Sequence, residues 1–358
     1  MSTGFHALRI AEVKKETEEA ISVCFEMPAD LESMFAFRPG QHLTLRSQIE
    51  GEDVRRNYSL CAAPHEKMWK VAIKRLPGGR FSGWANGGLT SGDTIDVMPP
   101  TGSFTWDFDP ARTASYALFA SGSGITPILS LLKAGLEQEP DSRFALFYGN
   151  RDSDSILFLE EIAALKDRYL GRLEVHHFLS REEDEITLFN GRIDGAKMDQ
   201  IIGPMLDPNG LEAAFACGPK GMMDAVEAAL TSAGMAADKI KTERFTTSEL
   251  SVEQLKAMEE LEKQAAGRPI KINMDGRKRT ISFDPEKVSI LENARAAGLR
   301  APYACKAGVC ATCRAKVVSG KVEMIRNFGL SAEEIEEGYI LTCQAIPLSD
   351  DVEVDYDA

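Results

Sequence analysis

Four cysteines near the C-terminus have the residue type and spacing to hold an inorganic cluster. Three lie in the run PYACKAGVCATCRAKV with the spacing C-x4-C-x2-C, and one follows after a long gap in YILTCQA; they are Cys305, Cys310, Cys313 and Cys343. This spacing is typical of plant-type 2Fe–2S clusters, in which four thiolates saturate two irons. Gly308 would let backbone N–H groups approach the sulfurs. A structural zinc site or a disulfide framework is the alternative, although zinc sites usually show paired C-x2-C knuckles.

A glycine-rich turn lies between a strand-like run and a helical run, which is the context of a nucleotide phosphate site. ASGSGITPIL follows the strand-like YALFA, and its Pro127 fits the first turn of a helix. A second run, AFACGPKGMMDAV, ends its strand at Cys217-Gly218-Pro219. Because ligands of open α/β sheets bind beyond the carboxyl ends of the strands, both turns are expected to border one crevice. A plain strand-to-helix turn would also give the first pattern.

The run RRNYSLCAAP could bind a flat phosphorylated cofactor. Arg56 and Tyr58 point to the same face of an extended segment, where a guanidinium can grip a pyrophosphate and a Tyr ring can cover an aromatic ring system. The Ser59 hydroxyl can bond a ring nitrogen. Downstream, LPGGRFSGWANG allows close backbone approach at Gly79, and Ser82 could open a helix that faces a phosphate. Ordinary strand and turn statistics remain the alternative for both runs.

Composition and charge narrow the class of protein. The chain has 358 residues, of which 44% are hydrophobic and 27% charged, with a formal net charge of -14. This charge argues against nucleic acid as a partner. The first residues lack the apolar core of a signal peptide, and no apolar run is long enough to span a bilayer. We therefore expect a cytoplasmic protein without a membrane partner.

Changes in pattern predict a multidomain α/β and β architecture. Short strands with Gly/Pro turns indicate an antiparallel β-barrel over residues 1–108. Strands that alternate with helical runs indicate a doubly wound parallel α/β domain over 109–246. Residues 247–268 are charged and Gln/Ala-rich, which predicts a linker with some helical character. From 269 to 358, a hairpin with the turn Asp275-Gly276 and the helical run SILENARAAG precede the cysteine loop.

The joint order of these motifs resembles the ferredoxin–NADP reductase superfamily. RNYSL, the segment with Ser82, GSGITP, YGNR, CGP and ERF follow one another as in those proteins. The C-terminal plant-type module makes the chain similar to oxygenase reductases with the order flavin, nicotinamide and iron–sulfur. It resembles in particular the reductase subunits of phenylacetyl-CoA epoxidases, on the runs FRPGQHLTLR, GGRFS, GRIDG, PYACKAGVCATC and LTCQA. The resemblance covers essentially the whole chain and implies a C-terminal β-grasp 2Fe–2S ferredoxin domain.

The resemblance also implies roles for particular residues. The flavin site, an FAD-binding barrel, would comprise Arg56, Tyr58, Ser59, Leu60, Val71, Ala72, Ile73, Lys74, Gly79 and Ser82. The NAD(P) site would comprise Gly122, Ser123, Gly124, Thr126, Pro127, Ser180, Arg181, Cys217, Gly218 and Pro219. Ser180 and Arg181 follow a strand in FLSREED, where related NADP-binding reductases carry Ser-Arg. A cation there favours the 2′-phosphate of NADPH, although a solvated Arg beside three acidic residues would look the same, and NADH stays open.

The function implied is electron transfer from NADPH through FAD and a 2Fe–2S cluster to the diiron oxygenase component of a multicomponent monooxygenase. The phenylacetyl-CoA epoxidase of aerobic phenylacetate degradation is the expected system. No general acid or base is required, and none is assigned. A reductase of another oxygenase or of a hybrid-cluster protein is an alternative, and so is a redox sensor or electron carrier without its own turnover. Lys306, Arg314 and Lys316 around the cysteine loop suggest a basic patch for an acidic partner, or a solvated rim.

Overall fold

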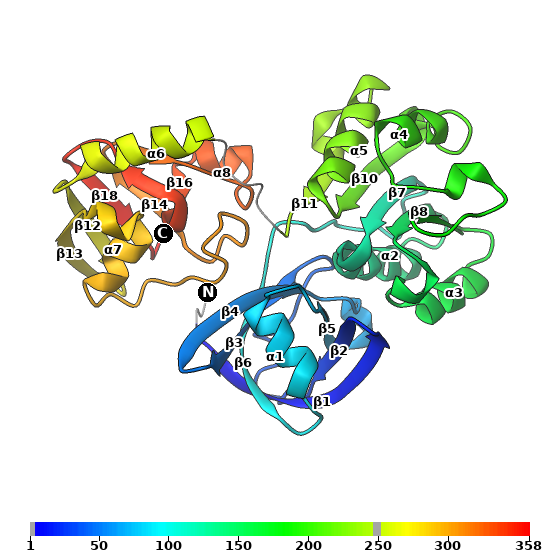
Figure 1. Cartoon of the computed structure of the whole chain (residues 1–358), viewed down its shortest axis with the longest axis horizontal. Helices are drawn as coiled ribbons and strands as arrows, with labels where there is room; N and C mark the ends of the chain where they lie inside the picture. Colours follow the sequence, from blue (N-terminus) through cyan, green and yellow to red (C-terminus); the bar gives the residue numbers. More distant parts are fainter. Residues whose placement is uncertain (1–3, 246–251) are drawn as a thin grey trace. The chain divides into compact units, whose positions relative to one another are not determined.

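The computed structural model describes residues 4–245 and 252–358, and these residues form two compact units (Figure 1). The first unit holds an antiparallel barrel and a parallel sheet. The second unit holds the helix α6 (Val252–Ala265) and all elements after it. The expected domain boundaries at 108, 246 and 268 stay predictions.

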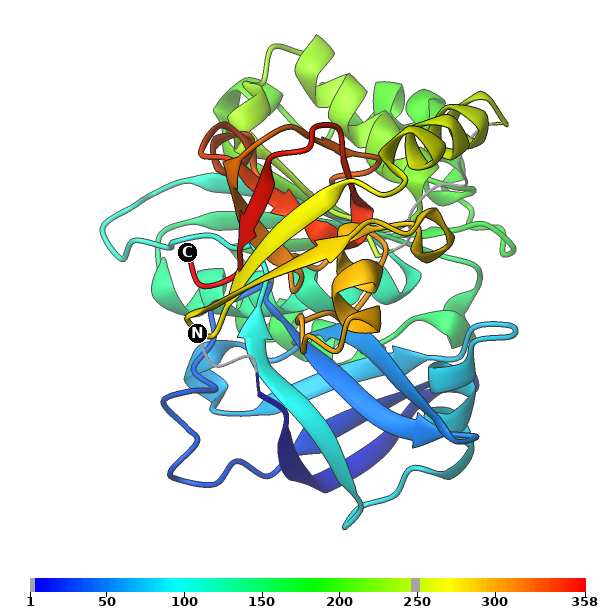
Figure 2. The ribbon, with the colours of Figure 1, turned by 90° about the vertical axis from the view of Figure 1, so that its left-hand side faces the viewer.

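Six antiparallel strands form the barrel, as the turn-punctuated sequence predicts (Figures 1 and 2). They are β1 (His6–Thr17), β2 (Ala20–Phe25), β3 (His42–Ile49), β4 (Glu52–Ser59), β5 (Trp69–Lys74) and β6 (Thr94–Thr101), in the order β4-β3-β6-β1-β2-β5. An antiparallel bridge between Leu60 and Val71 joins the two outermost strands and closes the barrel. The helix α1 (Arg80–Gly88) follows β5 and contributes Phe81 and Ala85 to the barrel core.

Five parallel strands form the second sheet of this unit. They are β7 (Ser115–Ser121), β8 (Arg143–Asn150), β9 (Leu173–Leu179), β10 (Leu211–Cys217) and β11 (Ile240–Glu243), in the order β11-β10-β7-β8-β9. The chain builds outward from β7 to β9 and then returns to add β10 on the other side of β7. The strand order therefore reverses between β7 and β10, where ligands of such sheets bind.

Helices cover both faces of the parallel sheet, which confirms the doubly wound fold (Figure 1). They are α2 (Ile125–Gln138), α3 (Leu159–Arg168), α4 (Gly195–Ile201) and α5 (Lys220–Ser232). Apolar residues of α2 and α3 pack with Leu118 on one face, and those of α4 and α5 pack with Phe119 on the other. The alternate residues of β7 thus face two separate cores, as expected for a buried parallel strand.

The second unit is built on a mixed sheet of five strands in the order β13-β12-β18-β14-β16. Its elements after α6 are β12 (Pro269–Met274), β13 (Arg277–Ser282), α7 (Ile290–Ala296), β14 (Arg314–Ser319), β15 (Val322–Met324), α8 (Ala332–Glu336), β16 (Tyr339–Leu341), β17 (Ala345–Pro347) and β18 (Val352–Asp355). The predicted hairpin turn is confirmed, because Asp275 and Gly276 both have positive φ. Ser289 caps α7, the helix expected from SILENARAAG.

The segment expected as a linker contains the helix α6. Ala265 at its end is 1% exposed and belongs to the core of the second unit, against which Leu261 also packs. Residues 247–251 of the expected linker lie outside the described residues. The end of α6 therefore belongs to the folded second unit, because its apolar residues pack against a core that the sequence pattern did not reveal.

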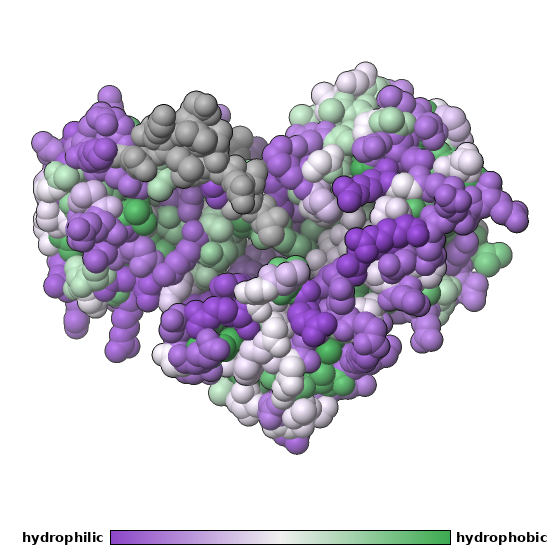
Figure 3. Space-filling model, in the orientation of Figure 1, coloured by the Kyte–Doolittle hydropathy of each residue, from purple (hydrophilic) through white to green (hydrophobic). Residues whose placement is uncertain are grey.

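The surface in view is mostly hydrophilic, with scattered hydrophobic residues (Figure 3). Within the two described ranges, none of the helices has the length and apolar character needed to cross a membrane.

Candidate functional site

The predicted flavin strand ends beside the helix α1. Arg56 is exposed, whereas Tyr58 is partly buried and packs on Phe81, with ring centroids 5.7 Å apart. Burial raises the pKa of Tyr58 above its ordinary value, so the phenol stays neutral. Ser59 is 4% exposed and points to the other side of the strand. The expected arrangement of Arg56 and Tyr58 on one side of an extended segment is present.

The side chains of Leu60, Val71 and Ile73 lie in the barrel core, and each is fully buried. These three side chains therefore serve the barrel core, and the place of the residues in the FAD site stays a prediction. Alternation along β5 places Ala72 and Lys74 on the opposite side. Ala72 packs toward the nucleotide-binding sheet, and Lys74 reaches the pocket described next.

A pocket of about 630 Å³ opens at the end of β5 and the beginning of α1. Its walls include Lys74, Gly79, Arg151 and Glu19. Because the first N–H groups of a helix lack intrahelical partners, this helix start and the flanking cations suit an anionic group such as a diphosphate. The size and charge of the pocket therefore fit part of a dinucleotide cofactor.

Ser82 does not open the helix α1, contrary to the expectation from the sequence, whereas its place in the FAD site stays a prediction. The helix α1 begins at Arg80 after Gly79, so Ser82 lies inside the first turn and does not open the helix. Its hydroxyl accepts from Leu76 N over 3.2 Å and donates to Gly79 O over 3.3 Å. A side chain at Gly79 would lie 2.4 Å from Ser82 Oγ, so the hydroxyl occupies space that such a side chain would need.

The predicted nucleotide turn has a geometry that requires glycine. Gly122 has a φ of +53°, and Tyr148 Oη donates to its carbonyl over 3.1 Å. Thr126 Oγ1 donates to Ser123 O over 3.0 Å, and Pro127 lies in the first turn of α2 as expected. The turn follows β7 and presents a helix N-terminus at the carboxyl edge of the sheet.

The two predicted turns of the nucleotide site meet at Gly124 and Cys217. A side chain at Gly124 would lie 2.0 Å from Cys217 O, and one at Gly218 would lie 3.1 Å from Ser121 Cβ. Pro219 follows as the residue that precedes α5. The structure thus brings Gly122–Pro127 and Cys217–Pro219 together at the point where the strand order reverses.

Glu243 links this crevice to the flavin strand, and the sequence reasoning did not single it out. Ser59 Oγ donates to Glu243 Oε2 over 3.3 Å, and Glu243 lies beside Cys217 in the pairing of β11 with β10. Desolvation raises the pKa of Glu243 to about 8, against a small opposing effect of the Ser59 hydroxyl. Burial and, to a smaller extent, Glu243 raise the pKa of Cys217. The run ERF was the only sequence signal for this residue.

Ser180 and Arg181 follow β9 at the same edge of the sheet. Ser180 N donates to Asn150 O over 3.1 Å, and Arg181 N donates to Arg151 O over 2.7 Å, so the backbone is held in place. Arg181 is exposed. The neighbouring Glu182 accepts from Ser153 N over 2.8 Å, which holds one of the three adjacent acidic groups.

In the second unit the four cysteines form two pairs. Cys305 pairs with Cys310, whose side chain lowers the pKa of Cys305 to about 5, with help from the Ala307 N–H. Cys313 likewise lowers the pKa of Cys343. Over the described residues, no three His, Cys, Asp or Glu side chains gather around one point, and all four thiols are free. Two pairs of cysteines fit the two terminal thiolates that each iron of a 2Fe–2S cluster needs.

The backbone of the cysteine loop fits the same cluster. Gly308 has a φ of +75°, and a side chain there would lie 3.0 Å from Arg326 O. Ala307 N approaches Cys305 Sγ at 3.3 Å, and Cys305 N approaches Cys310 Sγ at 3.5 Å. N–H groups directed at sulfur stabilise thiolates and adjust the potential of a bound cluster.

The basic patch proposed around this loop is smaller than the sequence suggests. Lys306 Nζ lies 2.8 Å from Glu292, and Arg314 Nη1 lies 2.5 Å from Glu334. The Lys316 ammonium lies 5.2 Å from the ring centroid of Tyr339. Acidic partners within the unit therefore offset much of this positive charge, and the structure lends little support to docking by these cations.

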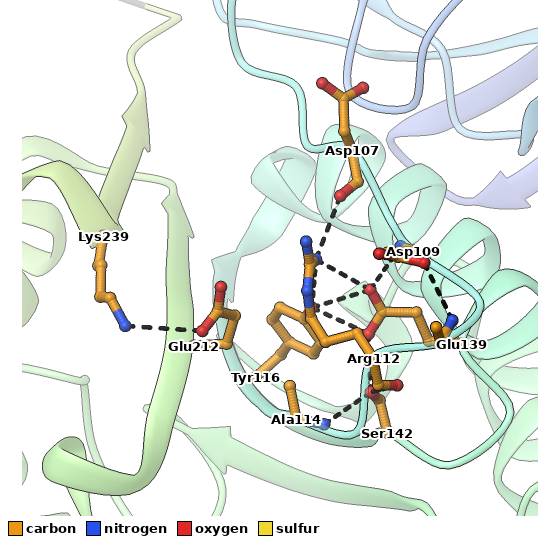
Figure 4. Close-up of polar contacts among 10 residues, drawn as sticks. Asp107, Asp109, Arg112, Ala114, Tyr116, Glu139, Ser142, Glu212 and Lys239 are labelled. Atoms are coloured by element: carbon orange, nitrogen blue, oxygen red, sulfur yellow. Dashed lines mark hydrogen bonds and ion pairs between the residues drawn. The ribbon is translucent and has the colours of Figure 1, made fainter.

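A second polar cluster lies at the opposite, amino-terminal edge of the parallel sheet (Figure 4). Glu139 is fully buried and accepts from Tyr116 Oη over 2.9 Å, from Ser142 Oγ over 2.7 Å and from Arg112 over 3.0 Å. Burial raises the pKa of Tyr116 to about 12. Since ligands bind at the carboxyl edge of such sheets, this cluster has a structural role.

Comparison with known proteins gives three family matches. The oxidoreductase FAD-binding domain matches residues 7–106, the oxidoreductase NAD-binding domain matches 118–228, and the 2Fe-2S iron-sulfur cluster binding domain matches 272–348. These three ranges contain the barrel strands, most of the parallel sheet and the cysteine loop, respectively.

Full-length relatives are also found. The chain is 42% identical to a subunit of the 1,2-phenylacetyl-CoA epoxidase of Escherichia coli (strain K12), over 99% of both chains. It is 34% identical to the ferredoxin reductase component of 3-ketosteroid-9-alpha-monooxygenase of Rhodococcus rhodochrous, over 98% of this chain and 96% of that protein.

Solved structures share the fold. Phthalate dioxygenase reductase, described as a modular structure for electron transfer from pyridine nucleotides to [2Fe-2S], matches with a TM-score of 0.60 and 25% identity over 98% of both chains. An intact type IV self-sufficient cytochrome P450 monooxygenase matches with a TM-score of 0.71 and 20% identity, over 98% of this chain and 41% of that one.

Proposed function

Because this chain belongs to the ferredoxin–NADP reductase superfamily, as an oxygenase reductase with a C-terminal 2Fe–2S ferredoxin domain, we propose that it supplies electrons to the diiron oxygenase component of a phenylacetyl-CoA epoxidase. The chain is an electron-transfer reductase that uses FAD, a nicotinamide nucleotide and a 2Fe–2S cluster. The observation that carries the proposed acceptor is the 42% identity to the epoxidase protein, which extends over all three domains.

The cofactors carry the electron chemistry, and the chain positions them. When bound, FAD would supply the conversion between a hydride, which carries two electrons, and single electrons, and the cluster would carry single electrons. In our proposal, Lys74 and the helix start after Gly79, which line the pocket, hold the FAD diphosphate together with the exposed Arg56, because all three offer positive charge or N–H groups. Tyr58 would cover the ring system, which its neutral phenol and packing on Phe81 permit.

The nicotinamide would lie between the turns that meet at Gly124 and Cys217. Ser59 approaches this point from the flavin strand and Glu243 from the nucleotide-binding sheet, and the two share a hydrogen bond there. Gly122 and the N-terminus of α2 would bind the nucleotide diphosphate. Cys217 is buried with a raised pKa, so it acts as an uncharged wall and not as a nucleophile.

We also propose NADPH as the preferred donor. Ser180 and Arg181 are held at the carboxyl edge of the sheet by backbone hydrogen bonds to Asn150 and Arg151. The exposed Arg181 guanidinium would be available to a 2′-phosphate, and the Glu182 carboxylate is engaged by Ser153.

The acceptor is tested by reconstitution. The purified chain, the oxygenase component of the epoxidase and phenylacetyl-CoA are mixed with NADPH in air-saturated buffer, which supplies O2, and we expect epoxide formation that depends on all four components. An inactive Cys343→Ser variant of the chain controls for reduction by free flavin. Reduction of the chain by NADPH without any epoxide would refute the proposed acceptor, and epoxidase activity unaffected by Cys343→Ser would refute the proposed route. A redox sensor would instead be reduced by NADPH but reoxidised slowly by every oxygenase component offered.

A further inference from the structure

A buried ion cluster joins the barrel to the helix that begins at the nucleotide turn. Lys133 of α2 is 5% exposed, and its ammonium lies 3.1 Å from Glu66, which follows the flavin strand in the chain. The same ammonium forms a second ion pair with Glu161 of α3. Lys70 of β5 approaches Glu161 to 3.2 Å. Two members of this cluster therefore come from the barrel, and two come from the helices of the nucleotide-binding sheet.

The same face of α2 makes two hydrogen bonds to consecutive carbonyls of the barrel. Ser130 Oγ donates to Ala62 O over 2.7 Å, and Lys133 Nζ donates to Cys61 O over 3.4 Å. Residues three apart lie on one helix face, so both donors point the same way. Ser130 Oγ also accepts from Gly40 N over 3.3 Å. The helix is thus attached at two successive points to the segment after β4.

This attachment is close in the chain to both halves of the proposed hydride-transfer site. Cys61 follows Ser59 by two residues, and Ser59 carries the hydrogen bond to Glu243. Lys133 follows Pro127 by six residues of helix, a rise of roughly 9 Å. A shift of α2 against this segment would therefore move the nicotinamide turn against the flavin strand. Misplacement of reacting atoms by about 1 Å can lower a rate on the order of 100-fold.

Charge in a buried position makes this attachment specific. Burial by itself would raise the pKa of Glu161, but Lys133 and Lys70 outweigh it and lower the pKa, so the carboxylate stays ionised. A buried ion pair adds little net stability compared with apolar packing, whereas it can fix one arrangement among several. Loss of Lys133 would leave Glu66 and Glu161 without the cation that they share.

We propose that Lys133 is a positioning residue for hydride transfer: it fixes the beginning of α2, and with it the nicotinamide turn, against the strand that carries the flavin site. Ser130 supports the same attachment. The proposal rests on the function of the chain as a nicotinamide- and flavin-dependent reductase, and it is independent of which oxygenase receives the electrons.

Lys133→Met tests the proposal, because Met keeps the apolar stem without the charge. Flavin reduction is followed anaerobically by stopped flow at increasing NADPH concentration, which separates the limiting rate from the dissociation constant. We expect the limiting rate to fall on the order of 10- to 100-fold, while the dissociation constant of NADPH changes by less than about threefold. Lys133→Arg should recover part of the rate. Hydrogen exchange of residues 61–66 should become faster in Lys133→Met, also in protein without flavin.

Lys197→Met is the matched control. Lys197 is another buried lysine of the same sheet domain, but its ammonium donates to Leu188 O over 2.6 Å and takes no part in the attachment to the barrel. We expect this variant to keep the wild-type limiting rate. If Lys133→Met does not fold, Ser130→Ala takes its place with a smaller loss of limiting rate. A wild-type limiting rate in folded Lys133→Met or Ser130→Ala would overturn the proposal, and so would an equal loss in Lys197→Met.

Discussion

At the scale of single residues, Glu243 is the group whose protonation the site controls most directly. Its carboxyl accepts a hydrogen bond from Ser59 and lies beside Cys217, whose thiol is uncharged because its pKa is raised. Desolvation raises its pKa from 4.5 to about 8, so the carboxyl is neutral at pH 7. In the proposed site, a neutral acid here would avoid a negative charge next to the flavin, which must accept electrons.

We therefore expect the rate of flavin reduction to fall as the pH rises through about 8, where Glu243 becomes charged. Glu243→Gln should remove this inflection, because Gln keeps the hydrogen bond with Ser59 and cannot ionise. Stopped-flow flavin reduction between about pH 6 and 10 measures the rate of the wild type and of Glu243→Gln on both sides of the expected transition. The same inflection in the Gln variant would assign it to another group.

The protonation of Glu243 also makes the free energy of unfolding depend on pH. The direction is opposite to that of a Glu in a salt bridge, whose contribution is lost as the pH falls. The pKa of Glu243 is raised in the folded protein, so its stabilising contribution is fully present below about pH 4.5 and is lost as the pH rises through about 8. Unfolding of the flavin-free protein should therefore show a decline over this window that is smaller in Glu243→Gln.

Arg181 carries the prediction of NADPH selectivity. Arg181→Ala should raise the KM for NADPH by about 10- to 100-fold, which corresponds to one or two charge-assisted hydrogen bonds, and should leave the KM for NADH nearly unchanged. Steady-state reduction of ferricyanide measures both constants without an oxygenase. Equal effects on the two nucleotides would show that the guanidinium does not contact the 2′-phosphate.

Sequence reasoning found residues whose partners are close along the chain. The spacing of Cys305, Cys310 and Cys313 already implies one loop. In the structure Cys305 pairs with Cys310, and Cys313 pairs with the distant Cys343. Sequence reasoning missed Glu243 because its partners, Ser59 and Cys217, are far away in sequence and no local pattern joins them. Sequence reasoning also missed Lys133, because a lysine in an amphipathic helix is expected at the surface.

At the scale of elements, the site depends on the close contact between the turn after β7 and the end of β10. Gly124→Ala would place a methyl group 2.0 Å from Cys217 O, which is backbone and has little room to move. We expect a loss of about 1–3 kcal/mol in the free energy of unfolding together with weaker nucleotide binding. Chemical denaturation and titration with NADP⁺ measure the two effects.

Gly221→Ala in α5 is the control for this prediction. No atom lies within 4 Å of a side chain at that position, so the substitution should be neutral or stabilise the protein by up to about 1 kcal/mol. If Gly124→Ala behaved like Gly221→Ala, the two turns would not be in the tight contact that the structure shows.

Helices and strands were predictable from the sequence where the hydrophobic period is clear and turn or capping residues mark the ends. The hairpin at Asp275-Gly276 and the helix after Ser289 follow from their turn and capping residues. The helix α6 and the start of α1 were less predictable. The core that buries Ala265 is formed by distant strands, and Gly79 precedes α1 without the side-chain cap that Ser82 had suggested.

At the scale of the whole molecule, the two units have separate cores. Apolar residues of the barrel pack with those of the parallel sheet, where Cys61 and Ala72 share a cluster with α2. The core of the second unit is formed entirely by residues from 258 onward among those described. The flavin and nucleotide sites therefore share one folded unit, and the cysteine loop belongs to the other.

This division predicts that cluster loss separates two activities. Cys343→Ser removes one thiolate of the second pair, so the 2Fe–2S cluster should be lost or labile. Reduction of FAD by NADPH should stay within about twofold of the wild-type rate, because neither core of the first unit changes, whereas electron delivery to an oxygenase component should fall at least on the order of 100-fold. Stopped-flow reduction and iron analysis measure the first activity and the cluster content, and coupled product formation measures the second. Unimpaired delivery without a cluster would mean that electrons leave directly from the flavin, and a parallel loss of flavin reduction would mean that the two units do not fold independently.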